Sequence, residues 1–497
     1  MATSFDCDVI VAGAGPAGSA AAIALAHGGL RVLVCEAQAF PRDKVCGDFL
    51  SAVAVGQLQA LGVTVRTDLA GANIVRDAAL YLDGRHLITS RFPAVREWRT
   101  PGRVLPRAAL DSMLAAKARA AGATIMENHR VIDFKVRPNA VEVTARTGPA
   151  ELKLRARALI GADGSASVIS RRLRGTDQLD GDRLIAIRGY FCGVHGPAAR
   201  ADLHFARESF PGYCWLFPTG KGEANVGVGM ILETLPPSSD QLRALLMRAI
   251  KDDAALDGRL HGAHVAGRIA GWPLTTYNPR LPVAGDRVLL AGDAAGLINP
   301  LNGEGIQYAL QSGRWAAETL VNCASTKDFS SAALAAYTQR VESEIGRDLG
   351  VARAAVHLLR NRSLNALWLE VLEAVVARAG VDPQYAQVTG GVLAGTVPVR
   401  QVLSLGIVRK TVMQLIGRAG VLALTNVPQS PQALTRTGVA VTQSLIDMLT
   451  PLRHARAETI HWATELALCA ATVAGLPRSA TNVGRFHDGD QGTQFKR

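Results

Sequence analysis

Three glycines near the N-terminus lie at the spacing of a nucleotide-binding turn. Gly13, Gly15 and Gly18 form a G-x-G-x-x-G pattern. In such a turn the first glycine permits a tight bend, the second lets the backbone approach a pyrophosphate, and the third lets a helix pack on a strand. The dipole and the free amides at the helix start then bind the phosphates. The pattern predicts a dinucleotide site, and a glycine-rich turn without a ligand is the simpler alternative.

Regular elements must position these glycines. Asp8–Ala12 is a short apolar run that is typical of a buried parallel strand, and Ser19–His27 is an alanine-rich helix. Arg31–Cys35 follows as a second strand, so the three segments form one βαβ unit. Glu36 ends this strand, where an acidic side chain can hydrogen-bond ribose hydroxyls. We therefore expect Glu36 to bind the ribose of the nucleotide.

A second glycine-rich segment, Gly292–Ile306, lies far along the chain. The predicted strand Arg287–Ala291 delivers Asp293 to a turn, where its carboxylate can accept hydrogen bonds from sugar or ribityl hydroxyls. A helix begins at Ile306, and its positive dipole end would favour the N1/C2=O edge of a flavin, above all in the reduced anionic form. Paired with the first turn, this segment predicts that the dinucleotide is FAD. A glycine-rich helix start used for packing is the alternative.

The composition limits the class of protein. A chain of 497 residues exceeds the usual size of one core, so two or three lobes are expected. The formal charge of +12 comes without a dense Lys/Arg block, so nucleic acid is not an expected partner. The seven cysteines show no metal-ligand spacing, and we expect no metal site. Without a secretory signal or a run of roughly 20 apolar residues, the expected compartment is the cytoplasm.

The fold class predicted for the chain is α/β: a Rossmann-like FAD-binding domain with an inserted antiparallel β-sheet and a helical C-terminal region. The FAD-binding domain is expected to be discontinuous, over residues 1–180 and 281–345. Residues 181–280 are expected to form a substrate-binding sheet, from alternating β-type segments at 185–193, 213–217 and 224–230. Residues 346–480 are expected to be mostly helical and residues 481–497 disordered.

Taken together, the motifs resemble those of a known superfamily. Flavoproteins of the p-hydroxybenzoate hydroxylase type have motifs similar to GAGPAG with Glu36, GADG at 161–164, and GDAAGLINPLNGEGIQYALQSG from position 292. The geranylgeranyl reductase-related branch has elements similar to Pro41–Asp48 (Lys-x-Cys-Gly) and to Gly212–Pro218 (Tyr-x-Trp-x-Phe-Pro) followed by Asn225–Gly229. The resemblance covers roughly residues 5–320. It implies an FAD-dependent oxidoreductase.

The resemblance also implies roles at the phosphate and adenine end of the cofactor. The phosphates would be held by the residues of the first turn, which are Gly13, Gly15, Pro16, Ala17 and Gly18. Glu36 would hold the adenosine ribose, with Ala37 beside it, and Val131 would lie against the adenine. Arg107, in an Arg-x-x-x-Asp pattern with Asp111, would contact the cofactor.

At the flavin end, the resemblance implies a second group of contacts. Cys46 and Gly47 would pass beside the flavin and the ribityl chain. Asp293 would bind near the ribityl chain and the pyrophosphate. The isoalloxazine edge would be lined by Asn302, Gly303 and Ile306.

Three residues are candidates for chemistry on the substrate side: Cys46, Tyr213 and Trp215. Tyr213 and Trp215 share one face of a strand by the two-residue period and could wall a cavity over the flavin. Packing inside a sheet core is an equal alternative for this pair. Cys46 could be redox-active or guard the flavin face, and its alternative role is that of an inert small residue.

The chain departs from the branch in its substrate-side loop. Asp48–Ser51 follows Cys-Gly where relatives often carry glycine, so this loop is expected to differ. The Tyr-x-Trp-x-Phe-Pro element argues against halogenation, since flavin halogenases carry Trp-x-Trp-x-Ile-Pro. Lys44 is the nearest lysine to the cofactor loop, but the pattern does not assign it a halogenase role. Because no second nucleotide-binding βαβ unit is visible, NAD(P)H would bind transiently or a separate protein would reduce the flavin.

The leading hypothesis is an FAD-dependent oxidoreductase that acts on a bulky, lipophilic small molecule. By resemblance, the reaction would be NAD(P)H-driven hydride addition to a carbon–carbon double bond. Oxygen-dependent hydroxylation or epoxidation of an aromatic or polyketide-like substrate is the rival, halogenation is a third alternative, and an FAD-bearing scaffold is the non-enzymatic one. The apolar C-terminal helices with interspersed arginines either cover the body of the protein or make a peripheral membrane contact.

Overall fold

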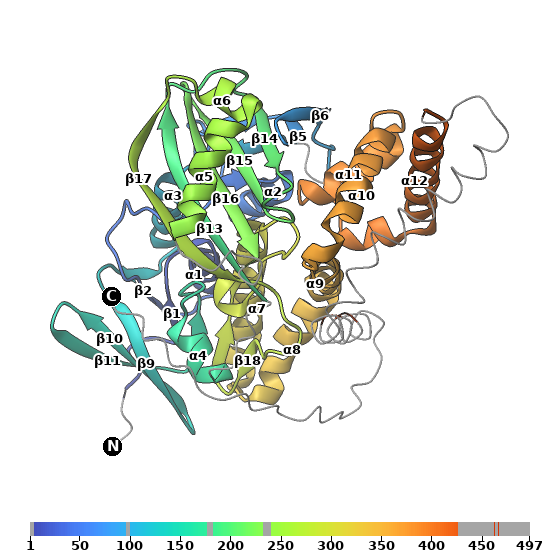
Figure 1. Cartoon of the computed structure of the whole chain (residues 1–497). Helices are drawn as coiled ribbons and strands as arrows, with labels where there is room; N and C mark the ends of the chain where they lie inside the picture. Colours follow the sequence, from blue (N-terminus) through green and yellow to red (C-terminus); the bar gives the residue numbers. More distant parts are fainter. Residues whose placement is uncertain are drawn as a thin grey trace, which may run out of the picture.

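The structure is a computed structural model that describes residues 4–95, 100–175, 182–231 and 240–425, together with Trp462 and Leu466. Within these residues, the central layer is a six-stranded sheet in the order β18–β19–β12–β1–β2–β8 (Figure 1). Its strands are β1 (Val9–Ala12), β2 (Val32–Cys35), β8 (Thr124–Met126), β12 (Ala158–Gly161), β18 (Ala284–Gly285) and β19 (Val288–Leu290). Neighbouring strands are parallel except β18 and β19. Strands β18 and β19, far along the chain, therefore lie in the same sheet as β1 and β2 of the first βαβ unit.

Helices cover this central sheet and pack closely on each other. They are α1 (Pro16–His27), α3 (Arg107–Ala120), α4 (Val168–Arg174), α7 (Ile306–Thr326) and α8 (Ser331–Val341). Helix α1 begins three residues before the predicted helix, because proline suits the first helical position. Helix α7 packs on α1, where a Cβ at Gly313 would lie 2.1 Å from the Ala17 carbonyl oxygen. The glycine therefore allows the N-terminal and late helices to approach closely.

A second large sheet stands above the central one. In the described part of the chain it has seven strands in the order β17–β13–β16–β15–β14–β5–β6. These are β5 (Asp77–Leu82), β6 (Arg85–Arg91), β13 (Arg183–Cys192), β14 (Arg200–Phe205), β15 (Tyr213–Gly220), β16 (Glu223–Ile231) and β17 (His264–Thr275). All neighbouring pairs are antiparallel except β14 with β5. Helices α5 (Asp240–Asp252) and α6 (Ala254–Leu260) pack against this sheet through a separate apolar cluster.

Strands β5 and β6 are an addition to the predicted sheet, because the sequence pattern did not indicate strands between residues 77 and 91. They form a hairpin that turns at Asp83–Gly84, where both residues have positive φ. An Asp-Gly pair between alternating residues is a hairpin signal. Two smaller sheets contain the order β11–β10–β9 and the order β3–β7–β4. The strands of these two sheets are β3 (Phe49–Leu50), β4 (Asn73–Val75), β7 (Gly102–Val104), β9 (Arg130–Arg137), β10 (Ala140–Thr147) and β11 (Ala150–Ala156). Helix α2 (Ala52–Ala60) follows β3 in the chain.

The C-terminal helices lie together on one side of the two large sheets (Figure 1, orange to brown). They are η4 (Glu342–Gly346), α9 (Arg347–Leu359), η5 (Arg362–Leu364), α10 (Asn365–Ala379), α11 (Pro383–Leu393), η6 (Val399–Leu403) and α12 (Leu405–Thr425). Leu369 of α10 packs in one apolar cluster with Leu203 and Phe205 of β14. The helices thus cover the body of the protein. The predicted disordered tail, residues 481–497, lies outside the described residues.

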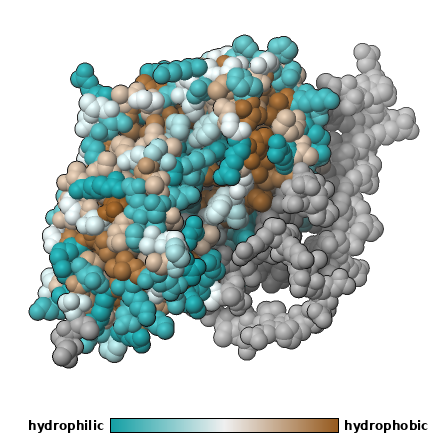
Figure 2. Space-filling model, turned by 90° about the vertical axis from the view of Figure 1, so that its left-hand side faces the viewer, coloured by the Kyte–Doolittle hydropathy of each residue, from teal (hydrophilic) through white to brown (hydrophobic). Residues whose placement is uncertain are grey.

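The fold confirms the predicted class, since a parallel FAD-type sheet, an inserted and mostly antiparallel sheet and C-terminal helices are all present. Hydrophilic residues cover much of the face shown in Figure 2, with hydrophobic patches among them. Among the described helices, none has the length and apolar character that a membrane crossing requires. Nor do His, Cys, Asp and Glu side chains form a potential metal-binding group anywhere in the described ranges.

Candidate functional site

The glycine turn after β1 has the geometry that its pattern predicts. Gly13 has a φ of +94°, and a Cβ there would lie 2.5 Å from the Ala162 carbonyl oxygen. A Cβ at Gly18 would lie 1.8 Å from the Gly13 carbonyl oxygen. At Gly15 the nearest atom to an added Cβ is a guanidinium nitrogen of Arg107, at 3.7 Å. Gly13 and Gly18 therefore close the turn, whereas Gly15 leaves open space at the start of α1.

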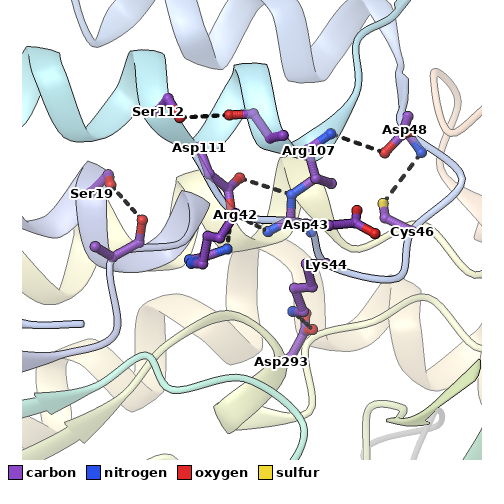
Figure 3. Close-up of polar contacts among 12 residues, drawn as sticks. Ser19, Arg42, Asp43, Lys44, Cys46, Asp48, Arg107, Asp111, Ser112 and Asp293 are labelled. Atoms are coloured by element: carbon purple, nitrogen blue, oxygen red, sulfur yellow. Dashed lines mark hydrogen bonds and ion pairs between the residues drawn. The ribbon is translucent and has the colours of Figure 1, made fainter. Parts of the chain in front are cut away.

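Two arginines and one aspartate lie beside this space (Figure 3). Arg107 is buried and donates two hydrogen bonds of 2.8 Å to Asp111. Arg42 donates to the same carboxylate at 2.8 Å, and its Nε donates to Glu36 at 3.0 Å. Burial disfavours the charge of Arg107, but Asp111 outweighs burial and holds the arginine pKa above its ordinary value. The two guanidiniums form a fixed cationic site next to a helix start.

Glu36 lies at the carboxyl end of β2, as the sequence predicts. Its Oε2 accepts a hydrogen bond from the Ala14 amide at 2.8 Å, so the acid also holds the glycine turn. The Glu36 carbonyl oxygen accepts a hydrogen bond from the amide of His129 at 2.7 Å. This contact brings the start of β9, with buried Val131, next to Glu36 and the following Ala37. These three predicted residues therefore lie close together.

Asp293 lies on η3 (Gly292–Ala295), directly after β19. Its Oδ2 pairs with Lys44 Nζ at 2.8 Å and accepts a hydrogen bond from Ser165 at 3.4 Å. Burial would raise the pKa of Asp293, but Lys44 and Arg107 together lower it below the ordinary value. Lys44 thus reaches from the Pro41–Asp48 loop to η3 (Figure 3).

The turn before α7 joins three parts of the fold at Asn302. Tyr213 of β15 donates its hydroxyl hydrogen to the Asn302 carbonyl oxygen at 2.8 Å. The Asn302 Nδ2 donates to a carbonyl oxygen of α11 at 3.2 Å. Gly303 has a φ of +73°, and Ile306 begins α7, whose N-terminus has no side-chain cap. The predicted residues Tyr213, Asn302, Gly303 and Ile306 therefore lie together.

Cys46 and Gly47 approach the large sheet from the Pro41–Asp48 loop. A Cβ at Gly47 would lie 3.1 Å from the Phe217 ring, so the loop backbone passes close to β15. Burial raises the pKa of the Cys46 thiol, which is therefore neutral at physiological pH. Its sulfur accepts a hydrogen bond from the Asp48 amide at 3.4 Å. A reactive thiolate at Cys46 is not favoured by these surroundings.

A buried polar network fixes the loop to the sheet at Asp48. Its Oδ2 accepts hydrogen bonds from the Tyr190 hydroxyl at 2.6 Å and from Asn225 Nδ2 at 2.8 Å. The Asn225 Oδ1 accepts a hydrogen bond from Trp215 Nε1 at 2.9 Å. Burial raises the pKa of Asp48 to about 6. Asp48 also has a φ of +63°, the backbone region that glycine adopts most easily.

Sequence reasoning missed several members of this site. Arg42, Lys44, Tyr190 and Asn225 were not among the predicted site residues. Arg42 and Lys44 belong to the loop that carries Cys46, so the charges of that loop were an available signal. Asn225 begins the Asn225–Gly229 element of the resemblance but was assigned no role. Tyr190 gave no comparable signal, because β13 and β16 become neighbours only in the folded sheet.

A cavity of about 890 Å³ opens between these parts. It contacts ten of the predicted residues, namely Pro16, Cys46, Gly47, Arg107, Tyr213, Trp215, Asp293, Asn302, Gly303 and Ile306. Its other walls are mostly apolar and include Leu203 and Phe205 of β14, Leu372 of α10 and Leu415 of α12. The other predicted residues, Gly13, Gly15, Ala17, Gly18, Glu36, Ala37 and Val131, do not line this cavity. The C-terminal helices therefore both cover the sheets and enclose the space.

The arrangement suits FAD. A dinucleotide needs an open approach to a helix start, which Gly15 leaves, and cations near its pyrophosphate, which Arg42 and Arg107 would supply. A flavin at the other end would reach the uncapped start of α7. The mostly apolar cavity is lined at that end by Asn302, Gly303 and Ile306.

Comparison with known proteins agrees with this geometry. An FAD binding domain family model matches residues 6–221. Menaquinone reductase of Mycolicibacterium smegmatis is 35% identical over 364 residues, which cover 71% of this chain and 84% of that protein. Digeranylgeranylglycerophospholipid reductase 1 of Methanopyrus kandleri is 32% identical over 376 residues, which cover 74% of this chain and 94% of that protein.

Solved structures share the fold. A geranylgeranyl bacteriochlorophyll reductase-like protein of Thermoplasma acidophilum superposes with a TM-score of 0.67 at 23% identity, over 84% of this chain and 99% of that one. A flavin-dependent brominase gives a TM-score of 0.62 at 21% identity, over 74% and 93% of the two chains. These two likenesses concern the fold alone. On the sequence relatives, the chain belongs to the geranylgeranyl reductase-related family of FAD-dependent oxidoreductases.

Proposed function

We propose that the protein is a reductase that adds hydrogen across carbon–carbon double bonds of a lipophilic small molecule. The observation that carries this proposal is the cavity of about 890 Å³, which is large for a ligand site and mostly apolar. FAD, when bound and reduced, supplies a hydride for such a reduction. The chain itself binds the apolar substrate, excludes water and holds the loops on either side of the cavity.

The names of two relatives support this substrate class. One is a menaquinone reductase and the other a digeranylgeranylglycerophospholipid reductase. A lipid with an unsaturated hydrocarbon chain would match the apolar walls formed by β14, α10 and α12. Burial of such a chain is favourable by about 0.8 kcal/mol for each CH₂ group that leaves water.

The predicted site residues take separate roles within this proposal. Gly15, Arg42 and Arg107 bind the pyrophosphate, and Glu36 binds the ribose. The turn from Asn302 to Ile306 receives the flavin edge. Tyr213 and Trp215 wall the cavity, and both are anchored, Tyr213 to the Asn302 carbonyl and Trp215 to Asn225. Cys46 lines the cavity as a neutral thiol beside the flavin end.

We propose NAD(P)H as the transient electron donor. The sequence shows no second βαβ nucleotide motif, which supports brief docking over a permanent site. Bleaching of the flavin absorption band by NADH or NADPH under argon would support direct reduction. A flavin that stays oxidised with both, yet is bleached by dithionite, would show that a separate protein is the donor.

The experiment that tests the function mixes dithionite-reduced protein with unsaturated isoprenoid lipids in the absence of oxygen. We expect the flavin band to return with a digeranylgeranyl phospholipid, which carries no quinone ring that the flavin could reduce instead. Ala386→Phe in α11 fills space in the cavity and should slow this reoxidation, because Ala386 lines it. Ala377→Phe is the matched control on α10, since Ala377 is not a lining residue. If no olefin reoxidises the flavin but oxygen plus an aromatic substrate yields a hydroxylated product, the protein is a monooxygenase.

We also propose that α12 contacts a lipid surface, from which the substrate enters. One side of α12, with Ile407, Thr411 and Leu415, lines the cavity. Its other side exposes large apolar side chains, among them Leu405 (88% exposed) and Ile416 (60% exposed). An apolar helix face of this kind can lie in the interface of a bilayer.

Vesicle sedimentation tests this contact. The double variant Leu405→Ser/Ile416→Ser should lose binding to vesicles of anionic phospholipid. Met247→Ser is the matched control, since Met247 is also exposed (45%) but lies on α5. Equal sedimentation of all three proteins, or no binding by the wild type, would contradict the proposed contact.

A further inference from the structure

Glu304 is an acidic residue of the cavity wall to which the sequence assigned no role. It lies in the turn between Asn302 and the start of α7. Its amide donates to Asn302 Oδ1 at 3.0 Å, and its carbonyl oxygen accepts from the Asn299 amide at 2.8 Å. The backbone of Glu304 is therefore fixed on both sides, in the same turn that would receive the flavin edge.

Uncharged groups surround the Glu304 carboxyl. The Gln307 amide can donate to Glu304 Oε1 at 3.1 Å and, in the same orientation, to Ser51 Oγ at 2.9 Å. A Cβ at Gly395 would lie 1.6 Å from Glu304 Oε2, so the main chain after α11 packs closely against the carboxyl group. Within the described ranges, no Lys, Arg or His forms a salt bridge with Glu304.

The nearby titratable groups do not favour a charged carboxylate. Tyr213 on β15 and Tyr308 on α7 are phenols whose pKa values burial raises, so both are neutral at pH 7. Asp293 lies near Gly305, but Lys44 pairs with it. Ser51 and the turn at Gly395 carry no charge. Burial accordingly raises the pKa of Glu304 to about 8, and the side chain keeps its proton at pH 7.

We propose that Glu304 is the proton donor of the reduction, an inference that rests on the proposed function. Reduction of a carbon–carbon double bond adds a hydride to one carbon and a proton to the other. Glu304 would break its O–H bond as the new C–H bond forms, and the carboxylate would regain a proton from solvent. Glu304 lines the same cavity as Tyr213, whose hydroxyl donates its hydrogen to the Asn302 carbonyl oxygen. Of the carboxyl groups on this wall, Asp293 pairs with Lys44 and Asp48 has a pKa of about 6, so Glu304 is the carboxyl that is mostly protonated at neutral pH.

The first test observes the proton without turnover. Infrared spectra of the FAD-free wild type and of FAD-free Glu304→Gln are compared at pH 7. The wild type should show the band of a protonated carboxyl group, and the variant should lack it. The band should disappear as the pH rises through about 8. Glu344→Gln, which changes an exposed glutamate of η4, is the matched control and should keep the band. A wild type without a Glu304-dependent band at pH 7 would overturn the proposal.

The second test follows reoxidation of the reduced, FAD-loaded protein by an unsaturated lipid under argon. Glu304→Gln should slow this step by about 10²–10⁴-fold, the usual contribution of a general acid. The wild-type rate should fall above pH 8, and the Glu304→Gln rate should show no such inflection. Glu304→Asp, which restores an acid on a shorter side chain, should recover part of the rate and the pH dependence. FAD content, measured from the absorption spectrum, is checked for each variant.

The outcomes separate the two claims. If the wild type is reoxidised and Glu304→Gln keeps its rate and its pH profile, the donor role is wrong while the reductase function stands. If Glu304→Gln lowers the rate at every pH but keeps the inflection, Glu304 positions other groups and is not the donor. If the wild type is not reoxidised by any unsaturated lipid, the proposed function fails and the donor role fails with it.

Discussion

Removal of Asp111 tests the geometry of the cationic site. The carboxylate is fully buried and accepts three hydrogen bonds of 2.8 Å, one from Arg42 and two from Arg107. Asp111→Ala leaves the Arg107 guanidinium buried without its partner, and breaking a buried ion pair costs about 3–5 kcal/mol. Arg42 keeps its contacts with Glu36, so we expect the loss to lie near the lower end of this range. The free energy of unfolding should fall by about 3 kcal/mol.

The assay is urea unfolding of the FAD-free and the FAD-loaded protein. The loss should shrink when FAD is bound, because the pyrophosphate would replace Asp111 as the partner of Arg107. Glu142→Ala removes an exposed ion pair with Arg137 and should leave the midpoint unchanged. A loss below about 1 kcal/mol in the FAD-free protein would refute the reasoning about the buried pair. An equal loss with and without FAD would refute the placement of the pyrophosphate.

Two further predictions concern the glycine turn and the Asp48 network. Gly18→Ala should abolish FAD binding, because the added Cβ would lie 1.8 Å from the Gly13 carbonyl oxygen. Flavin absorbance measures this binding. Gly258→Ala is the control and should bind FAD normally, since Gly258 is an exposed residue of α6 with open space around it. Asp48 has a folded pKa of about 6 against 3.8 in the unfolded chain, so its contribution to stability is present below pH 4 and is lost as the pH rises through 6. The unfolding free energy of wild type relative to Asp48→Ala should therefore fall by up to about 3 kcal/mol between pH 4 and pH 7, and an unchanged difference would contradict the buried network.

The features predicted correctly from the sequence depend on local patterns. The glycine turn, the first βαβ unit and the strand before η3 are confirmed. They could be predicted because a short apolar run that ends in glycine is typical of a strand buried in a parallel sheet. The enzyme class and FAD are confirmed by the family. The site roles and the domain boundaries stay predictions.

The features that sequence reasoning missed depend on contacts between distant segments. Lys44 pairs with Asp293, which lies 249 residues further along the chain, and Asn225 meets Asp48 only because β16 lies opposite the Pro41–Asp48 loop. The environment of Glu304 depends on Gly395, which belongs to the C-terminal helical region. No periodicity or spacing in the sequence encodes such neighbours. The departure from glycine at Asp48–Ser51 predicted only a different loop, and it indicated neither the positive φ of Asp48 nor its buried partners.

The central claim is that the apolar cavity is a site of double-bond reduction. The most direct measurement is the mass of the product after a single turnover of reduced protein with a digeranylgeranyl phospholipid, which has no quinone ring, with oxygen excluded. The account predicts a product that is heavier than the substrate by two hydrogen atoms, in an amount that matches the reoxidised flavin. An unchanged substrate under argon, together with an oxygen-containing product when air is admitted, would contradict it.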